Sequence, residues 1–302
     1  MKLAPALLSL TLLLPAALAA EEVGNDSFHW QGEALAKPVG GEKFAASAFI
    51  HPLKTPSGFV LTNTQPIDHL HHFGIWWPWK FIEVDGARYN TWEIQMGEGA
   101  HVATAAKKVS SEDGVTTWEL HNQTLAKPKN GEPFVALTEV TRLSQSRAGD
   151  ANIFDIEIRH EAKDKPVTIV NYRYSGFTWR GSKEWNKDNS LMTTSGGKGR
   201  DDANGTQARW VLVSGDAPNG KASMLLLSAA SSIAGAEEQV RVWDAKSHNG
   251  APFVNFNPVM SKSLELNAEN KAVSHRKYRV IAADRAITPE EAEKIWREWM
   301  GS

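Results

Sequence analysis

Alternation of apolar and polar residues through the second half of the chain limits the fold more than any other feature. In residues 153–160, Phe154, Ile156 and Ile158 alternate with charged residues, as in a strand with one buried face. Similar stretches rich in β-formers lie at 134–143, 167–174, 208–213, 222–228, 240–244 and 277–282. Turn signals separate them every roughly 8–15 residues. This pattern predicts an all-β sandwich or barrel rather than alternating βα units.

One helix is expected, at the C-terminus. Thr288 can cap it, Pro289 suits the first helical position, and Glu291 completes a capping box. An apolar stripe to pack on a sheet would be formed by Ala292, Ile295, Trp296 and Trp299. No internal repeat or linker is evident, so we predict one domain over residues 21–302.

The first 20 residues have the pattern of a secretory signal peptide. Lys2 precedes an apolar stretch at residues 7–14, and Ala17-Leu18-Ala19 forms a small-residue cleavage site. We therefore expect a periplasmic or secreted protein with no membrane segment after cleavage; a retained signal anchor is the alternative. The chain has no cysteine, which excludes disulfides and thiolate metal ligands, and its net charge of -2 gives no electrostatic basis for binding nucleic acid.

The sequence Asp68-His69-Leu70-His71-His72 is the strongest candidate for a functional site. In a strand, His69 and His71 would share a face and His72 would point away. Two imidazoles on one face can act as acid and base on a bound ring, or bind a metal, and Asp68 can orient one of them. An exposed polar loop or a structural hydrogen-bond network is the alternative. No third metal ligand stands out among His51, His101, His121, His160, His248 and Glu93.

Tryptophans cluster directly after these histidines. Indole rings can support sugar rings or fill a core, and alternation would send Trp76 and Trp77 to opposite faces, one to the core and one to a site. Together with His51, Trp92 and Glu93, they are predicted to bind substrate. The carboxylate that partners the histidines stays open among Glu93, Glu139 and Glu184.

Three further polar residues are candidates. Arg180 ends a predicted strand and can hold a carboxylate or a developing oxyanion, or form a surface ion pair. Asn255 and Asn257 would share a face of an extended segment and bind hydroxyls, unless they serve the turn before Pro258. Sequence motifs of serine hydrolases, dinucleotide-binding proteins, P-loop proteins and zincins are absent.

The segments HPLKTPSG (51–58), DHLHHFGIWW (68–77) and NTWE (90–93) resemble the signature of the PmoA-like family. Weaker similarity lies at 176–180, 199–210 and 253–258, whereas Phe73 and Asn90-Thr91 depart from the family pattern. The resemblance implies a large antiparallel β-sandwich similar to galactose mutarotase, with a site on one concave sheet. The family's oxygenase label should not be inherited, because a membrane-integrated subunit needs several apolar spans.

We therefore predict an exported carbohydrate-active enzyme, an epimerase, lyase or glycosidase, acting on a sugar or keto-sugar. His69, His71 or His72 would move the proton, with Asp68 and Arg180 in support. No cofactor is predicted, and the partner is a small-molecule or oligosaccharide substrate. The alternatives are a non-catalytic carbohydrate-binding protein and a metal-dependent hydrolase or lyase with His69 and His71 as ligands.

Overall fold

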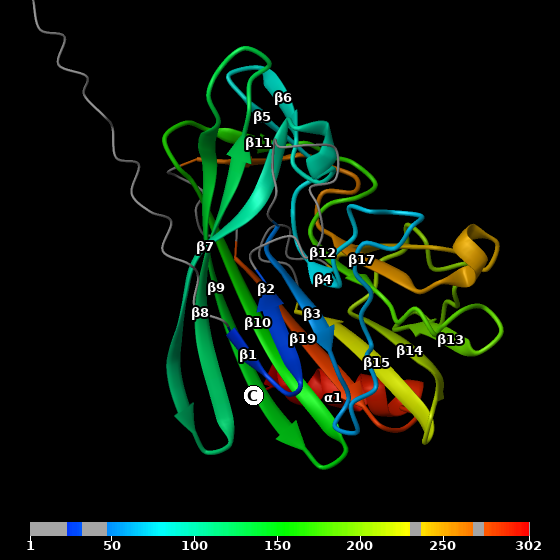
Figure 1. Ribbon diagram of the computed structural model, residues 1–302. Helices are drawn as coiled ribbons and strands as arrows, with labels where there is room; N and C mark the ends of the chain where they lie inside the picture. Colours follow the sequence, from blue (N-terminus) through cyan, green and yellow to red (C-terminus); the bar gives the residue numbers. More distant parts are fainter. Residues whose placement is uncertain (1–22, 32–46, 230–236, 268–274, 302) are drawn as a thin grey trace, which may run out of the picture.

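Most of the described part of the chain forms three antiparallel sheets and one C-terminal α-helix (Figure 1). The computed structural model describes residues 23–31, 47–229, 237–267 and 275–301, so the predicted signal peptide at 1–20 lies outside the described residues. The predicted all-β sandwich with one C-terminal helix is confirmed. Among the described residues, none of the helices combines the length and the apolar character that a bilayer span requires.

The first layer is a seven-stranded sheet in the order β1-β2-β3-β4-β12-β17-β16. Its strands are β1 (Val23–Asn25), β2 (Phe28–Gln31), β3 (Phe49–Leu53), β4 (Ile75–Trp76), β12 (Phe177–Arg180), β16 (Gln239–Val242) and β17 (Phe253–Asn257). The second layer is an eight-stranded sheet in the order β13-β14-β15-β19-β10-β9-β8-β7. Its strands are β7 (Gly99–Glu112), β8 (Val115–Ala126), β9 (Phe134–Ala148), β10 (Ala151–Ala162), β13 (Ser190–Thr194), β14 (Trp210–Ala217), β15 (Gly220–Ser228) and β19 (Arg276–Ala283).

A four-stranded sheet, in the order β18-β11-β5-β6, forms the upper end of the molecule in Figure 1. Its strands are β5 (Phe81–Val84), β6 (Ala87–Asn90), β11 (Val167–Ile169) and β18 (Leu264–Leu266). An Asp85-Gly86 turn joins β5 to β6, and both residues have positive φ, as this kind of hairpin requires. Two short 3-10 helices, η1 (Ile94–Met96) and η2 (Ser247–Gly250), lie in connections.

The main core lies between the two large sheets. On β10, Phe154, Ile156 and Ile158 are buried as their alternation predicts. The seven-stranded sheet contributes the inward residues of β12 and β17, among them Phe177 and Val254. The residues next to them in sequence point the other way, so this sheet also has a polar and aromatic outward face, which carries the candidate site.

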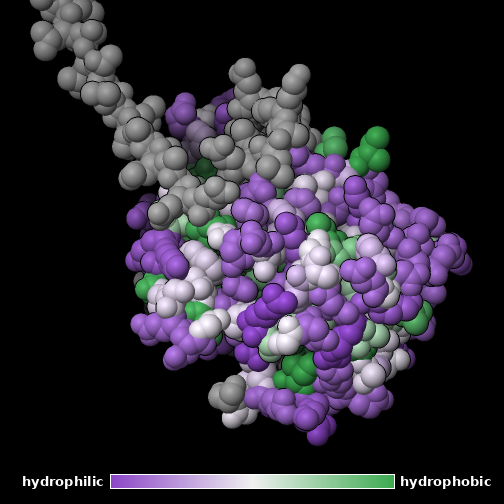
Figure 2. All heavy atoms as spheres, turned by 60° about the horizontal axis from the view of Figure 1, so that its bottom comes forward, coloured by the Kyte–Doolittle hydropathy of each residue, from purple (hydrophilic) through white to green (hydrophobic). Residues whose placement is uncertain are grey.

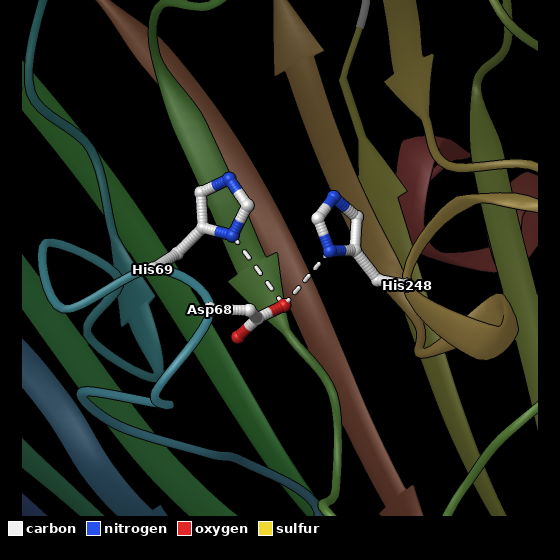
Figure 3. A group of neighbouring side chains, drawn as sticks. All are labelled: Asp68, His69 and His248. Atoms are coloured by element: carbon white, nitrogen blue, oxygen red, sulfur yellow. Dashed lines mark ion pairs between the residues drawn. The ribbon is translucent and has the colours of Figure 1, made fainter.

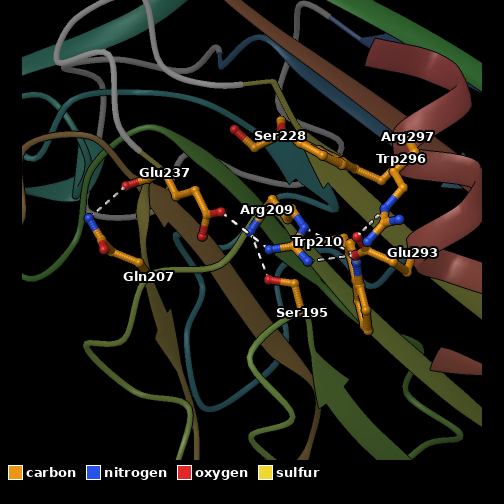
Figure 4. Close-up of polar contacts among 9 residues, drawn as sticks. All are labelled: Ser195, Gln207, Arg209, Trp210, Ser228, Glu237, Glu293, Trp296 and Arg297. Carbon is orange, nitrogen blue, oxygen red and sulfur yellow. Dashed lines mark hydrogen bonds and ion pairs between the residues drawn. The ribbon is translucent and has the colours of Figure 1, made fainter. Parts of the chain in front are cut away.

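The C-terminal helix α1 (Pro289–Gly301) packs against β14 and β15 of the eight-stranded sheet (Figure 4). The Glu293 carboxylate accepts hydrogen bonds from the Trp210 indole at 2.9 Å and from Arg209 at 2.8 Å, and the Trp296 indole donates to the Ser228 carbonyl at 3.0 Å. The predicted apolar stripe therefore faces the sheet.

The predicted cap of this helix is confirmed at Thr288. Its hydroxyl accepts a hydrogen bond from the Glu291 amide at 3.2 Å. The Glu291 carboxylate does not complete the capping box and pairs with Arg285 instead.

The lower end of the molecule has a mostly hydrophilic surface (Figure 2). Apolar residues on this face form small, separate areas rather than one continuous patch. Such scattered apolar residues are ordinary for a folded domain and do not indicate a binding surface.

Candidate functional site

Strand alternation builds the floor of the site. On β12, Phe177 and Trp179 enter the main core, so Arg180 ends the strand on the outward face. On β4 and β17, the same alternation turns Trp76 and Phe253 outward, where they join a separate aromatic cluster. The floor is therefore one cation beside a layer of buried aromatic rings.

The histidine segment lies in a loop above this floor, before β4. Two turns shape it, because the His69 amide donates to the Pro66 carbonyl and the His72 amide donates to the His69 carbonyl. The segment is a loop and not a strand, so the arrangement that a strand would give, with His72 pointing away, does not apply. Instead, the His69 and His72 rings stack at 4.5 Å between centroids, and His71 lies 4.9 Å from His72. All three imidazoles converge.

A fourth imidazole comes from η2, far away in the sequence. His248 contacts the Asp68 carboxylate at 3.1 Å, and its ring stacks on Trp243 at 4.0 Å between centroids. His248 was only one of several remote histidines in the sequence, with no spacing to select it. The only local signal was the loop-tip sequence His248-Asn249-Gly250.

Asp68 connects the loop to the floor. Its carboxylate accepts hydrogen bonds from Arg180 at 3.0 and 3.2 Å and lies 3.4 Å from His69. The Arg180 guanidinium also covers the Trp243 ring at 4.4 Å. Arg180 therefore forms a part-buried ion pair with Asp68. It is not among the residues that line the adjacent cavity.

That cavity has a volume of about 170 Å³. His69, His71 and His72 line it. The other lining residues are Lys80, Trp92, Glu93, Tyr172, Arg173 and Tyr174. Glu93 is ion-paired with Lys80 and accepts a hydrogen bond from Asn90 at 2.7 Å. The cavity thus brings imidazoles, a carboxylate, an ammonium group and phenolic rings together.

Burial keeps the three imidazoles neutral. It lowers the pKa of His71 to about 4, lowers that of His69, and places that of His72 well below the usual value. The carboxylates of Asp68 and Glu93 are ionised because each has a neighbouring cation. Burial opposes their charge, but Arg180 holds the pKa of Asp68 below its usual value and Lys80 does the same for Glu93. Neutral imidazoles can accept a proton or bind a metal ion.

The tryptophans are core residues on both sides of the sheet. Trp76 and Trp77 are 0% exposed, and Trp92 is 3% exposed. As alternation predicted, Trp77 enters the main core while Trp76 lies on the site side, 5.2 Å from the His72 ring. Trp92 alone among the three reaches the cavity wall. Trp76 thus packs against a site histidine, and the three buried indoles do not form an open platform.

His51 lies on β3 at a different cavity, of about 860 Å³. Its Nδ1 atom lies 2.9 Å from the Thr62 hydroxyl, and burial lowers its pKa to about 4. Glu184, another candidate from the sequence, lines the same cavity. Neither residue lines the histidine cavity.

Asn255 and Asn257 share a strand, β17, as predicted, but their amides serve the backbone. Asn255 donates to the Ser175 carbonyl at 2.8 Å, and Asn257 donates to the Tyr172 carbonyl at 2.7 Å. Both side chains are buried. They hold in place the segment 172–175, which carries two tyrosines of the cavity wall.

A second polar cluster lies inside the main core, around Glu139. Its carboxylate accepts hydrogen bonds from Trp77 at 2.8 Å and Asn122 at 2.6 Å, and lies 2.8 Å from His101 and 2.9 Å from His160. Burial alone would raise the pKa of Glu139, but the two histidines hold it well below the usual value. His101, His160 and Glu139, which were candidates from the sequence, are therefore structural residues of the buried core.

Comparison with known proteins gives a family but no activity. The model of DUF6807, a family of unknown function, matches residues 27–297, and the chain belongs to that family. This match corrects the resemblance to the PmoA-like family, which the comparison does not support. No curated protein matches the chain.

Proposed function

We propose that this member of the DUF6807 family is an exported carbohydrate-active enzyme that moves a proton on a sugar or keto-sugar. The observation that carries the proposal is the cavity of about 170 Å³, which His69 and His71 line together with the Lys80–Glu93 ion pair. Cavities for drug-sized ligands are larger, so this one suits a ligand the size of a single sugar ring.

The charge state of the cavity favours a lyase or an epimerase over a glycosidase. A typical glycosidase uses two carboxyl groups, one of them protonated to act as the acid. Asp68 and Glu93 are both held ionised by neighbouring cations, so neither is suited to that role. A neutral imidazole can instead abstract a proton from carbon.

The substrate that fits such a base is a keto-sugar. Because burial lowers the pKa of His71 to about 4, this base requires an acidic C–H bond. A neighbouring carbonyl acidifies that bond and takes up the developing negative charge on oxygen. Lys80 and Arg173 are the cations at the cavity that can stabilise this oxygen.

Proton exchange in deuterated water tests the proposal directly. Purified protein is incubated with keto-glycosides and with the matching native glycosides, and NMR follows deuterium uptake and elimination at the carbon beside the carbonyl. We expect turnover of the keto form, and a loss of about 100-fold or more in His71→Ala. His121→Ala, on the surface-exposed part of β8, is the matched control and should keep full activity.

Two outcomes would overturn the proposal. Full activity in His71→Ala would remove His71 from its role. Saturable sugar binding without exchange or elimination on any substrate would identify a non-catalytic binding protein instead.

A further inference from the structure

Three side chains beside the cavity place metal-binding atoms around one point. Asp68 and His69 come from the loop before β4, and His248 comes from η2 (Figure 3). One carboxylate oxygen of Asp68, Oδ2, lies 3.4 Å from His69 Nδ1 and 3.1 Å from His248 Nδ1. Both rings turn a nitrogen toward this oxygen (Figure 3). The candidate ligand atoms all lie within 4.8 Å of one another.

The two nitrogen–oxygen separations match those between neighbouring ligands of one metal ion. Nitrogen and oxygen ligands lie about 2.0–2.2 Å from a zinc ion, so neighbouring ligands in a tetrahedral or octahedral shell are about 3.0–3.5 Å apart. The two nitrogen–oxygen distances fall in this range. His71, which the sequence paired with His69 as a ligand, does not belong to this group.

Two further observations separate this group from an ordinary hydrogen-bond network. His69 Nδ1 is shielded from solvent, and its separation of 3.4 Å from the carboxylate is long for a hydrogen bond. His248 and Asn249 both adopt left-handed backbone conformations, with φ of 51° and 55°. Such conformations cost free energy in residues other than glycine and are found preferentially at functional sites. Here the strained turn delivers the imidazole to Asp68.

We propose that Asp68, His69 and His248 bind one divalent first-row transition metal ion, with Zn²⁺ as the probe of choice. Two imidazoles and one carboxylate form a typical three-ligand set for zinc or iron and leave a coordination position for water or substrate.

Arg180 would orient the carboxylate from outside the metal's coordination shell. It hydrogen bonds to both oxygens of Asp68, so Oδ2 can bind the ion while Oδ1 stays fixed. Its positive charge also repels the ion. We therefore expect weaker binding than at a site of the same ligands without a neighbouring cation.

In this arrangement His69 is a metal ligand and His71 is the base at the cavity, so the site would do more than transfer a proton. His69 lines the cavity and also belongs to the ligand group, so a bound ion would lie at the edge of the sugar site. There it can polarise a substrate oxygen.

Metal binding is measured without any sugar substrate. The full chain is stripped with a chelator, and Zn²⁺ is titrated by calorimetry; Co²⁺ then reports the coordination geometry by its absorption spectrum. We expect one ion per chain. His248→Asn and Asp68→Asn should weaken binding by about 100-fold or more, beyond the effect typical of residues outside the coordination shell. Asparagine tolerates the left-handed conformation, so the first variant removes the imidazole and keeps the turn.

His71→Ala and His121→Ala are the controls and should bind Zn²⁺ with unchanged affinity. Absence of stoichiometric binding by the wild-type chain, or equal affinity in His248→Asn, would overturn the proposal. Loss of binding in His71→Ala alone would replace this ligand set with another. Stoichiometric Zn²⁺ without turnover of any keto-sugar would leave the metal site standing and reject the proposed reaction.

Discussion

At the scale of single residues, burial is the main cause that lowers the pKa of five histidines: His51, His69, His71, His72 and His160. His51 shows this most simply, because desolvation is the cause of its lowered pKa. It lies away from the histidine cluster and contacts Thr62. Its effect on stability can therefore be measured apart from the candidate site.

His51 should make the fold sensitive to mild acid. The unfolded chain binds a proton on this residue near pH 6.5, whereas the folded chain does so only near pH 4, so stability falls as the pH drops between these values. The shift corresponds to about 3 kcal/mol at most, and to roughly 1–2 kcal/mol after solvent screening at this half-buried site. Urea unfolding of wild type and His51→Gln at pH 7 and about pH 4.5 measures it. Parallel pH profiles in the two proteins would contradict the expectation.

The sequence predicted which residues of the histidine loop belong to the candidate site, but it did not predict how their side chains are oriented. The local cluster predicted that His69, His71 and His72 lie together. It could not predict that two turns make all three converge, because that depends on the Pro66 and His69 carbonyls as acceptors. Nor could it select His248, whose position depends on how β16 and β17 pair in the sheet.

At the scale of secondary-structure elements, a polar row crosses three strands inside the core. Asn122 on β8, Glu139 on β9 and His160 on β10 are direct cross-strand partners. Trp77 adds a hydrogen bond from the opposite side of the core. The Glu139 carboxylate is thereby the acceptor that satisfies polar groups from both layers.

Replacing this carboxylate should weaken the whole sandwich. Glu139→Gln removes the buried charge that His101, His160 and the Trp77 indole contact. We expect a loss of about 3–5 kcal/mol in the free energy of unfolding. Glu119→Gln, a more exposed acid that pairs with Lys107, is the control and should cost no more than about 1 kcal/mol. Urea unfolding followed by tryptophan fluorescence compares the two. Equal losses in both variants would contradict a special role for Glu139.

The C-terminal helix provides a second test at this scale. Thr288→Ala removes the hydroxyl that accepts the Glu291 amide and should cost about 1 kcal/mol of stability, whereas Thr288→Ser should cost little. Hydrogen exchange of the first-turn amides of α1 measures the local effect. Unchanged exchange in Thr288→Ala would show that the cap is dispensable.

At the scale of the whole molecule, the long strands β8 and β9 connect two cores. Trp118 and Leu120 belong to the main core, whereas Ala126 and Leu137 belong to the core beneath the four-stranded sheet. Opening either core exposes apolar surface on the same strands. The two parts should therefore be energetically coupled.

We expect one unfolding transition for the described fold. Far-ultraviolet circular dichroism follows the strands and tryptophan fluorescence follows side-chain packing, and both should give the same midpoint in urea. Two separate midpoints would mean that the four-stranded sheet unfolds independently. They would also argue against one domain over residues 21–302.

Alternation carried most of the information about architecture. The pattern at 153–160 predicted β10, and the cap and apolar stripe predicted α1. The same rule placed Asn255 and Asn257 on one face of β17, but it could not show that the backbone of 172–175 uses both amides. The composition likewise shows many tryptophans, but it cannot predict that Trp76 and Trp77 are fully buried.

The small volume of the histidine cavity limits which part of a glycan could enter it. A cavity of about 170 Å³ receives one ring and not a stretch of polymer. The substrate of our proposal is then a free monosaccharide derivative or the terminal unit of a longer glycan. On a longer glycan, elimination would release only the terminal keto unit, because the unit that it exposes is a native sugar and not a keto-sugar. The polymer would lose one unit per oxidised end and would not be cut within the chain.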